Sequence, residues 1–175
     1  LGPSNYGELS YAVSFVSIFS FIAVLGIDQI LYRDLIRYPD KRNQYMGSAL
    51  TLRVLTSVIA IVLCLVSAFL LSPKDVSFYL IFIICLGFLF NSFQIINFEF
   101  QANSASKIPS ILSLAVTILL NIVKIIVIMF DQGVIYLALT LLLESVLYAI
   151  GFVYYRNKIY GSIKNWAFDK AIASS

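Results

Sequence analysis

Five long apolar runs restrict what this chain can fold into. Each is long enough for a helix that crosses the hydrocarbon core of a bilayer, which needs about 20 mostly apolar residues. Transmembrane β-strands need only about 10 residues and alternate strictly between apolar and polar positions, which these runs do not. The sequence therefore predicts an all-α polytopic membrane helix bundle. Its five transmembrane helices cover about residues 10–31, 46–71, 76–96, 108–130 and 134–155.

The composition also favours a membrane protein. Of the 175 residues, 61% are hydrophobic and only 12% are charged, whereas soluble domains are typically about 25% charged. The chain has no histidine, and Cys64 and Cys85 lack metal-ligand spacing, so neither a metal nor another cofactor is predicted. The first run lacks the basic region and cleavage site of a signal peptide. The chain begins at Leu1 without an initiator methionine, so we expect an internal piece of a longer polytopic protein, with processing or trimming of the chain as the alternative.

The basic residues predict the orientation of the helices, because Lys and Arg concentrate in the cytoplasmic loops of membrane proteins. The connectors after the first and third predicted helices and the C-terminal tail, with the helix ends beside them, contain ten basic residues. The connectors after the second and fourth helices contain only Lys74. We therefore predict that the N-terminus lies outside and the C-terminus inside. The net charge of +3 then requires no nucleic-acid partner. The ten residues are Arg33, Arg37, Lys41, Arg42, Arg53, Lys107, Arg156, Lys158, Lys164 and Lys170.

Polar residues recur along one face of each predicted helix. Small and hydroxyl side chains can serve helix packing alone, but ionisable groups at membrane depth are costly and usually face a bundle interior or a wet cavity. The combined stripes predict a polar central cavity, with solid helix packing as the alternative. By helix, the stripes are Ser10, Ser14, Ser17 and Asp28; Arg53, Thr56, Ser57, Ala60, Cys64 and Ser67; Asn91, Gln94, Asn97 and Gln101; Ser110, Ser113, Thr117, Asn121 and Lys124; and Thr140, Glu144, Tyr148, Gly151 and Tyr155.

Lys124 lies deep in the fourth predicted helix and needs a partner. The three-residue connector 131–133 predicts that the fourth and fifth helices are antiparallel neighbours. Side chains lean toward the N-terminus of their own helix, and a rise of 1.5 Å per residue leaves about 6 Å of height between Lys124 and Glu144. We predict an intramembrane ion pair between them. The alternative is that Lys124 extends to the outer interface and Glu144 is protonated.

A second charged layer lies near the predicted inner ends of the first three helices. It contains Asp28, Arg33, Asp34, Arg53 and Glu99. Interfacial anchoring and local ion pairs account for most of these residues. Arg53 is the predicted exception, because its stripe continues into the membrane and a guanidinium binds phosphate bidentately.

Three stretches in the first third of the chain resemble bacterial polysaccharide flippases of the O-antigen translocase (Wzx) type, which belong to the multidrug/oligosaccharidyl-lipid/polysaccharide exporter superfamily. The stretches are LGPSNYGELSYAVSF, LGIDQILYRDLI and GSALTLR. From its residues alone, the first stretch is a turn-rich approach to a helix, with Pro3, Asn5 and Gly7 as turn residues. The resemblance implies about twelve helices in two lobes around a cavity that opens alternately to each side. This chain would be most of the N-terminal lobe.

The resemblance further implies a function. The protein would move polyprenyl-diphosphate-linked O-antigen or polysaccharide repeat units across the bacterial inner membrane, and it would not be an enzyme because no bond changes. Its implied partners are the lipid-linked oligosaccharide, membrane lipids, and a polysaccharide polymerase or chain-length regulator.

The chemistry of the side chains indicates which residues could bind this cargo or couple an ion to its movement. A diphosphate needs cationic partners and sugar hydroxyls need amides, while acidic residues can exchange protons or cations during coupled transport. The candidate substrate-binding residues are Lys124, Arg53, Asn121, Asn91 and Gln94. The candidate ion-coupling residues are Glu144 and Asp28.

Three other functions compete with flipping. An exporter of drugs or small solutes from the same superfamily would have a cavity dominated by acidic and aromatic groups. An integral-membrane enzyme on lipid-linked sugars would need clustered carboxylates or an acidic metal motif, and the sequence contains neither. In a scaffold without transport, the polar stripes would serve only helix packing.

Overall fold

The computed structural model describes residues 3–24, 27–71, 76–130, 132–163 and 166–169. These residues form helices and contain no strand. Among them, five helical segments are long and apolar enough to cross a membrane. The predicted all-α bundle with five spanning helices is confirmed.

The third of the five spanning segments is divided by a short 3₁₀ turn, η2, into α4 and α5. The first spanning segment runs over α1 and α2, and residues 25–26 between them lie outside the described residues. In chain order, the elements are α1 (Pro3–Val24), α2 (Ile27–Arg37), η1 (Pro39–Lys41), α3 (Arg42–Leu71), α4 (Val76–Asn91), η2 (Ser92–Gln94), α5 (Ile95–Ala102), α6 (Lys107–Met129) and α7 (Val134–Tyr160).

The turn residues predicted from the sequence can be compared with the observed helix ends. Pro109 lies in the first turn of α6, as its position in the sequence predicts. The prediction of turn residues at Pro3, Asn5 and Gly7 is wrong, because all three belong to α1. A proline at the first helical position loses no hydrogen bond, and a continuous helix satisfies the backbone groups that hydrocarbon cannot. The connector 72–75 lies outside the described residues.

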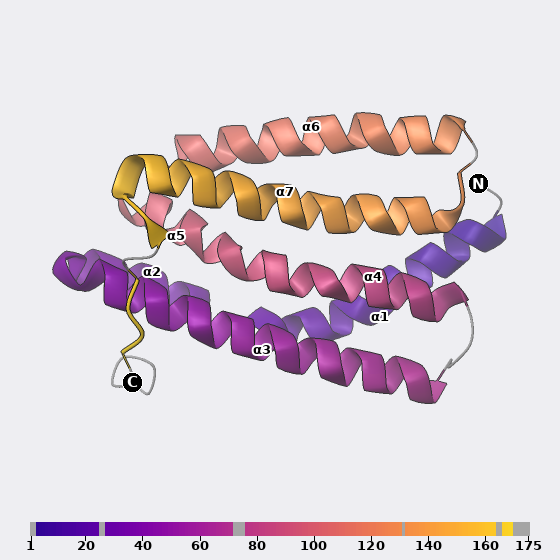
Figure 1. The fold of residues 1–175 in the computed structure, drawn as a ribbon, viewed down its shortest axis with the longest axis horizontal. Helices are drawn as coiled ribbons and strands as arrows, with labels where there is room; N and C mark the ends of the chain where they lie inside the picture. Colours follow the sequence, from indigo (N-terminus) through magenta and orange to yellow (C-terminus); the bar gives the residue numbers. More distant parts are fainter. Residues whose placement is uncertain (1–2, 25–26, 72–75, 131, 164–165, 170–175) are drawn as a thin grey trace.

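The helices pack in an order that differs from their order in the chain. Figure 1 shows α6, α7, α4 and α3 one after another across the bundle, and α1 packs on both α3 and α4. The predicted antiparallel packing of α6 on α7 is confirmed. We call the end that contains α2 and α5 the α5 end, and the opposite end, where α1 begins, the N-terminal end.

Two apolar cores hold the bundle together. Small side chains dominate the core among α1, α3 and α4, where Ala12, Ala60, Cys64 and Cys85 are completely buried. Small residues let helix backbones approach closely where lipid replaces water as the solvent. The core at the α5 end is built from larger side chains, Phe100 among them.

The segment that follows α7 lies across the first turns of α3. The Ala167 amide donates to the Asn43 carbonyl at 3.3 Å, and the Asp169 amide donates to Ser48 Oγ at 3.0 Å. A Cβ added at Gly47 would lie 2.5 Å from the Ala167 carbonyl oxygen. Only a glycine therefore permits this contact between α3 and the segment of residues 166–169.

We expect the substitution Gly47→Ala to displace this segment. The clash is with backbone atoms, so the segment has to move, and overpacking of this kind typically costs about 1–3 kcal/mol. Thermal unfolding of the purified protein in detergent measures the cost. Gly7→Ala is the matched control, because nothing lies within 4 Å of its added Cβ. Equal stability of the two variants would contradict the packing described here.

Candidate functional site

The break in the third spanning segment places amide side chains inside the bundle. The turn η2 separates α4 from α5, and short 3₁₀ stretches within helices often mark functional positions. Ser92 Oγ donates to the Phe88 carbonyl at 3.2 Å, so the Ser92 hydroxyl bonds to the backbone of the helix next to the break. Gln94 Nε2 donates to Asn91 Oδ1 at 3.1 Å, so these two candidate residues lie side by side.

Four cavities surround this break and share lining residues. Their volumes are about 330, 240, 100 and 270 Å³. Gln94 lines the first three, and Asn97 and Ser113 line both the second and the fourth. Because neighbouring cavities have walls in common, they form a polar cleft that runs from the middle of the bundle to the α5 end. We call this set of four cavities the polar cleft.

The predicted pairing of Lys124 with Glu144 is confirmed. Lys124 Nζ donates to Glu144 Oε2 at 3.0 Å, from α6 to α7. Each of the two side chains is 27% exposed, so the pair is accessible rather than sealed in a core. Glu144 lines the 330 Å³ cavity together with Asn91, Gln94 and Tyr148. Glu144 therefore lies in the wall of the polar cleft, and Lys124, which lines none of the four cavities, reaches the cleft through its contact with this carboxylate.

Arg53 and Asp28 form a second ion pair deeper in the bundle. Arg53 Nη2 donates to Asp28 Oδ2 at 3.1 Å, and the Arg53 side chain is only 6% exposed. Arg53 Nη1 and Asp28 Oδ1 are buried without a hydrogen-bond partner in the described part of the chain. Arg53 lines the 100 Å³ cavity and Asp28 the 240 Å³ cavity. The pair is neutral overall and keeps one buried donor and one buried acceptor without a partner among the described residues.

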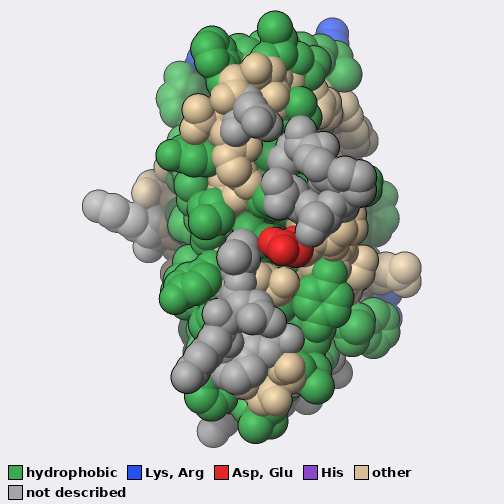
Figure 2. All heavy atoms as spheres, turned by 90° about the vertical axis from the view of Figure 1, so that its right-hand side faces the viewer, with side chains coloured by type: hydrophobic (Ala, Val, Ile, Leu, Met, Phe, Trp, Pro, Cys, Tyr) green, Lys and Arg blue, Asp and Glu red, His purple; other side chains and the backbone are tan. Residues whose placement is uncertain are grey.

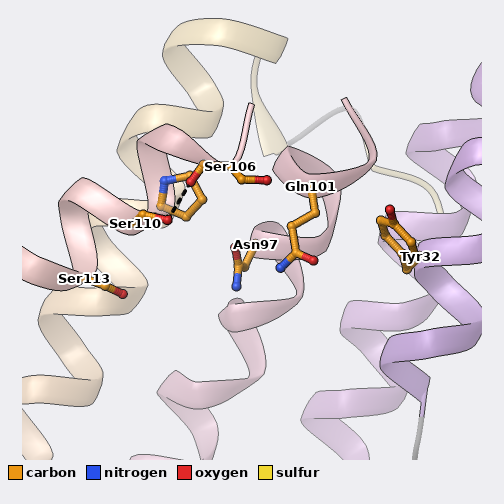
Figure 3. A pocket seen from close by; sticks show the side chains of 7 residues that line it. Tyr32, Asn97, Gln101, Ser106, Ser110 and Ser113 are labelled. Carbon is orange, nitrogen blue, oxygen red and sulfur yellow. Dashed lines mark hydrogen bonds between the residues drawn. The ribbon is translucent and has the colours of Figure 1, made fainter. Parts of the chain in front are cut away.

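Neutral polar groups surround the cavity at the α5 end. In Figure 3, Asn97 and Gln101 of α5 lie between Tyr32 of α2 and the serines of α6. Tyr32 is not among the candidate residues from the sequence, because it follows the predicted first helix at 10–31 and is not part of a polar stripe. Asn97 and Gln101 are detectable as members of the polar stripe on the third predicted helix.

A polar seam joins α6 to α7. Thr117 Oγ1 and the Tyr148 hydroxyl lie 2.9 Å apart, and the same hydroxyl donates to the Ser113 carbonyl at 3.5 Å. A Cβ added at Gly151 would lie 2.6 Å from the side chain of Leu112, so the small residue permits close approach of the two helices. The stripe on the fourth predicted helix therefore points to α7 and to the cleft.

Packing, not a cavity, accounts for most of the polar stripe on α3. Thr56 Oγ1 donates to the Ala23 carbonyl at 3.0 Å, and Ser57 Oγ lies 3.0 Å from Ser92 Oγ. Ala60 and Cys64 are completely buried. The prediction that the combined stripes line a cavity is wrong for Thr56, Ala60 and Cys64, which pack against neighbouring helices, whereas Ser57 also lines the 100 Å³ cavity. Asn121 is exposed on α6 and lines none of the four cavities.

Sequence reasoning missed a buried charge cluster at the α5 end. Arg156 Nε donates to Glu99 Oε2 at 3.2 Å, and the two side chains are 1% and 0% exposed. Arg42 Nη1 lies 3.7 Å from Glu99 Oε1, and the Arg156 guanidinium lies 4.7 Å from the centroid of the Trp166 ring. From the sequence, Arg156 is only one of the basic residues of the tail and Glu99 an interfacial residue. The cluster joins α3, α5, α7 and the segment after α7.

Thiol labelling distinguishes the polar cleft from the packed face of α3. We expect a hydrophilic thiol reagent to modify a cysteine at Gln101 at least about tenfold faster than one at Ala60, because the reactive thiolate needs water. The native Cys64 and Cys85 are buried and serve as an internal baseline. Equal labelling rates at Gln101 and Ala60 in detergent-solubilised protein would contradict the assignment of the cleft.

The surface of the bundle fits a lipid environment. Large apolar side chains such as Phe21, Leu70 and Met129 are more than 70% exposed, which a monomer in water would rarely tolerate over so wide an area. Seen from the N-terminal end in Figure 2, hydrophobic side chains occupy most of the visible outline, and acidic side-chain atoms lie near its centre. With apolar helices outside and a polar cleft inside, the molecule is a multi-pass membrane protein of the transporter class.

Comparison with protein families gives the particular assignment. The model of a family described as polysaccharide biosynthesis protein matches residues 1–174. The chain therefore belongs to the polysaccharide biosynthesis protein family, which is the family of the Wzx-type polysaccharide and O-antigen flippases. The resemblance seen in the sequence is confirmed. Comparisons with curated proteins and with solved structures give no significant match.

Proposed function

We propose that the protein translocates polyprenyl-diphosphate-linked O-antigen or related polysaccharide repeat units across the bacterial inner membrane by alternating access. The observation that carries this proposal is the polar cleft, a row of cavities with shared walls inside an otherwise apolar bundle of this family. The cargo has a polar head and an apolar tail. The cleft suits the head, and the exposed apolar helices suit a tail that stays in the bilayer.

Lys124 supplies the contact with the diphosphate in this proposal. Its ammonium is 3.0 Å from the Glu144 carboxylate, and a diphosphate that enters the 330 Å³ cavity competes with Glu144 for that charge. Charge-assisted hydrogen bonds of this kind are about twice as strong as neutral ones. Glu144, once released, is free to take a proton or a cation, which couples an ion to the movement of the cargo. Asp28, at the second ion pair, is the other candidate for ion coupling.

The two ion pairs differ in what they offer an anion. Arg53 keeps Asp28 at 3.1 Å and is almost completely buried, so its charge is already compensated. The Lys124 pair is more exposed and exchanges partners at lower cost. We therefore assign the diphosphate to Lys124 rather than to Arg53, and the neighbouring amides of Asn91 and Gln94 to sugar hydroxyls. No covalent step is part of this mechanism, and a polymerase or chain-length regulator would act on the cargo afterwards.

Reconstitution of the protein into liposomes tests the proposal. Liposomes that contain a fluorescent polyprenyl-diphosphate oligosaccharide are treated with an impermeant glycosidase, and the protected fraction measures transbilayer movement. We expect the protein to make the protected half accessible, and the same lipid with a monophosphate and no sugar to move more slowly. If proteoliposomes leave the lipid-linked sugar protected but extrude cationic dyes, the small-solute exporter replaces the flippase.

A further inference from the structure

The cavity at the α5 end contains polar groups that nothing in the described part of the chain satisfies. The side-chain amides of Asn97 and Gln101 and the hydroxyl of Tyr32 make no hydrogen bond with any described residue. Ser110 Oγ donates to the Ser106 carbonyl at 2.8 Å, so that hydroxyl is already engaged as a donor. Figure 3 shows the two amides extending from α5 into the space between α2 and α6. Two free amides therefore face one cavity of about 270 Å³.

The chemistry of this cavity differs from that of the two ion pairs. No Asp, Glu, Lys or Arg side chain lines it among the described residues; the polar groups are amides, hydroxyls and one phenol. An amide offers both a donor and an acceptor, which matches a sugar hydroxyl that both donates and accepts. A phosphate offers only acceptors and would leave the amide oxygens unpaired, at a cost.

Size and position agree with a saccharide. The volume is close to the lower end of the range of about 300–1,000 Å³ that ligand sites occupy, and Tyr32 adds an aromatic face with a polar tip to the wall. Asn97 and Ser113 also line the next cavity of the polar cleft. A ligand can therefore extend from this cavity toward the Lys124–Glu144 pair.

We propose that this cavity is a subsite for an uncharged sugar of the cargo, and that Asn97 and Gln101 determine its specificity. The inference rests on the proposed function, because it divides the cargo between two places in the polar cleft. The sugar hydroxyls bind the amides at the α5 end, and the diphosphate binds Lys124.

Binding of two separate probes tests this division. The first probe is the free oligosaccharide released by mild acid from the lipid-linked repeat unit of the source strain, and the second is inorganic pyrophosphate. Saturation-transfer NMR or calorimetry on the purified protein in detergent gives the dissociation constants. We expect Asn97→Leu and Gln101→Leu each to weaken oligosaccharide binding about fivefold to tenfold, the loss of one or two hydrogen bonds, and to leave pyrophosphate binding unchanged. Lys124→Met should weaken pyrophosphate binding and leave oligosaccharide binding unchanged.

Matched controls keep the result interpretable. Gln132→Leu removes an exposed amide at the opposite end of the bundle and should change neither constant. Asn97→Ser replaces the amide with a hydroxyl, which still donates and accepts, so its oligosaccharide binding should fall between wild type and Asn97→Leu. It replaces the leucine variant if that variant unfolds at a lower temperature. Because the amino end of α6 lies at this cavity and such ends attract anions, equal weakening of both probes by Asn97→Leu would overturn the inference.

Failure of the subsite and failure of the flippase proposal give different results. If wild type binds no free oligosaccharide at about 10 mM, roughly tenfold above a dissociation constant of about 1 mM, and still flips the lipid-linked sugar, only the subsite is wrong. If wild type binds the oligosaccharide through Asn97 and Gln101 but flips no lipid, the saccharide site holds and the proposed function is wrong.

Discussion

Replacement of Glu99 by alanine is expected to lower the free energy of unfolding by about 3–5 kcal/mol, the usual cost of removing one partner of a buried ion pair. Glu99 is 0% exposed and Arg156 is 1% exposed, with 3.2 Å between Glu99 Oε2 and Arg156 Nε. Without the carboxylate, the Arg156 guanidinium keeps its neutral acceptors, the Gly161 carbonyl at 2.6 Å and Asn43 Oδ1 at 3.4 Å. Its charge then has no compensation in a region that excludes water.

Two further variants separate charge from packing in this experiment. Glu99→Leu combined with Arg156→Met should recover most of the loss, because well-packed apolar residues often replace a buried pair without penalty. Asp34→Ala breaks the pair with Arg33, whose side chain is 68% exposed, and should cost less than about 1 kcal/mol. Thermal or denaturant unfolding in detergent measures all three. If Glu99→Ala is no more destabilising than Asp34→Ala, the cluster does not hold the α5 end together.

Removal of the charge at Lys124 is expected to reduce flipping about tenfold to hundredfold while stability changes little. A hydrogen bond from a charged group is worth about 1.5–3 kcal/mol, which corresponds to that range in binding. The side chains of Lys124 and Glu144 are each 27% exposed, so their mutual attraction adds little to folding. Lys124→Met and Glu144→Gln should therefore impair transport in liposomes without a large shift in unfolding temperature.

Charge reversal tests whether Lys124 and Glu144 act as a pair. The single variants Lys124→Glu and Glu144→Lys place like charges 3 Å apart, and both should be inactive. The double variant restores opposite charges across α6 and α7 and should recover a measurable part of transport. If the double variant is as inactive as the singles, direct pairing has no role in the cycle. Asn121→Leu is a suitable control, because Asn121 lies on the same helix, is exposed, and makes no hydrogen bond or ion pair with any described residue.

The candidate site could be predicted from sequence only where its partners lie close along the chain. Lys124 and Glu144 are 20 residues apart across a three-residue connector, so helix geometry alone brings them together. Arg156 and Glu99 are 57 residues apart, and no local pattern relates them. The free amides of Asn97 and Gln101 fall between these cases. Periodicity predicts that they share a face, but not that Tyr32 stands opposite.

Five apolar helices follow from the sequence alone, because a bilayer leaves backbone groups no partner but their own helix and sets the length of each segment. The sequence also determines which residues share a face, because the helical period is constant. What each face contacts is not predictable from the period and depends on the tertiary fold. The small residues of the α3 stripe pack against α1 and α4, while the amides of α5 line a cavity. That difference depends on which helices become neighbours. The choice of neighbours depends on van der Waals fit among side chains that are far apart in the chain.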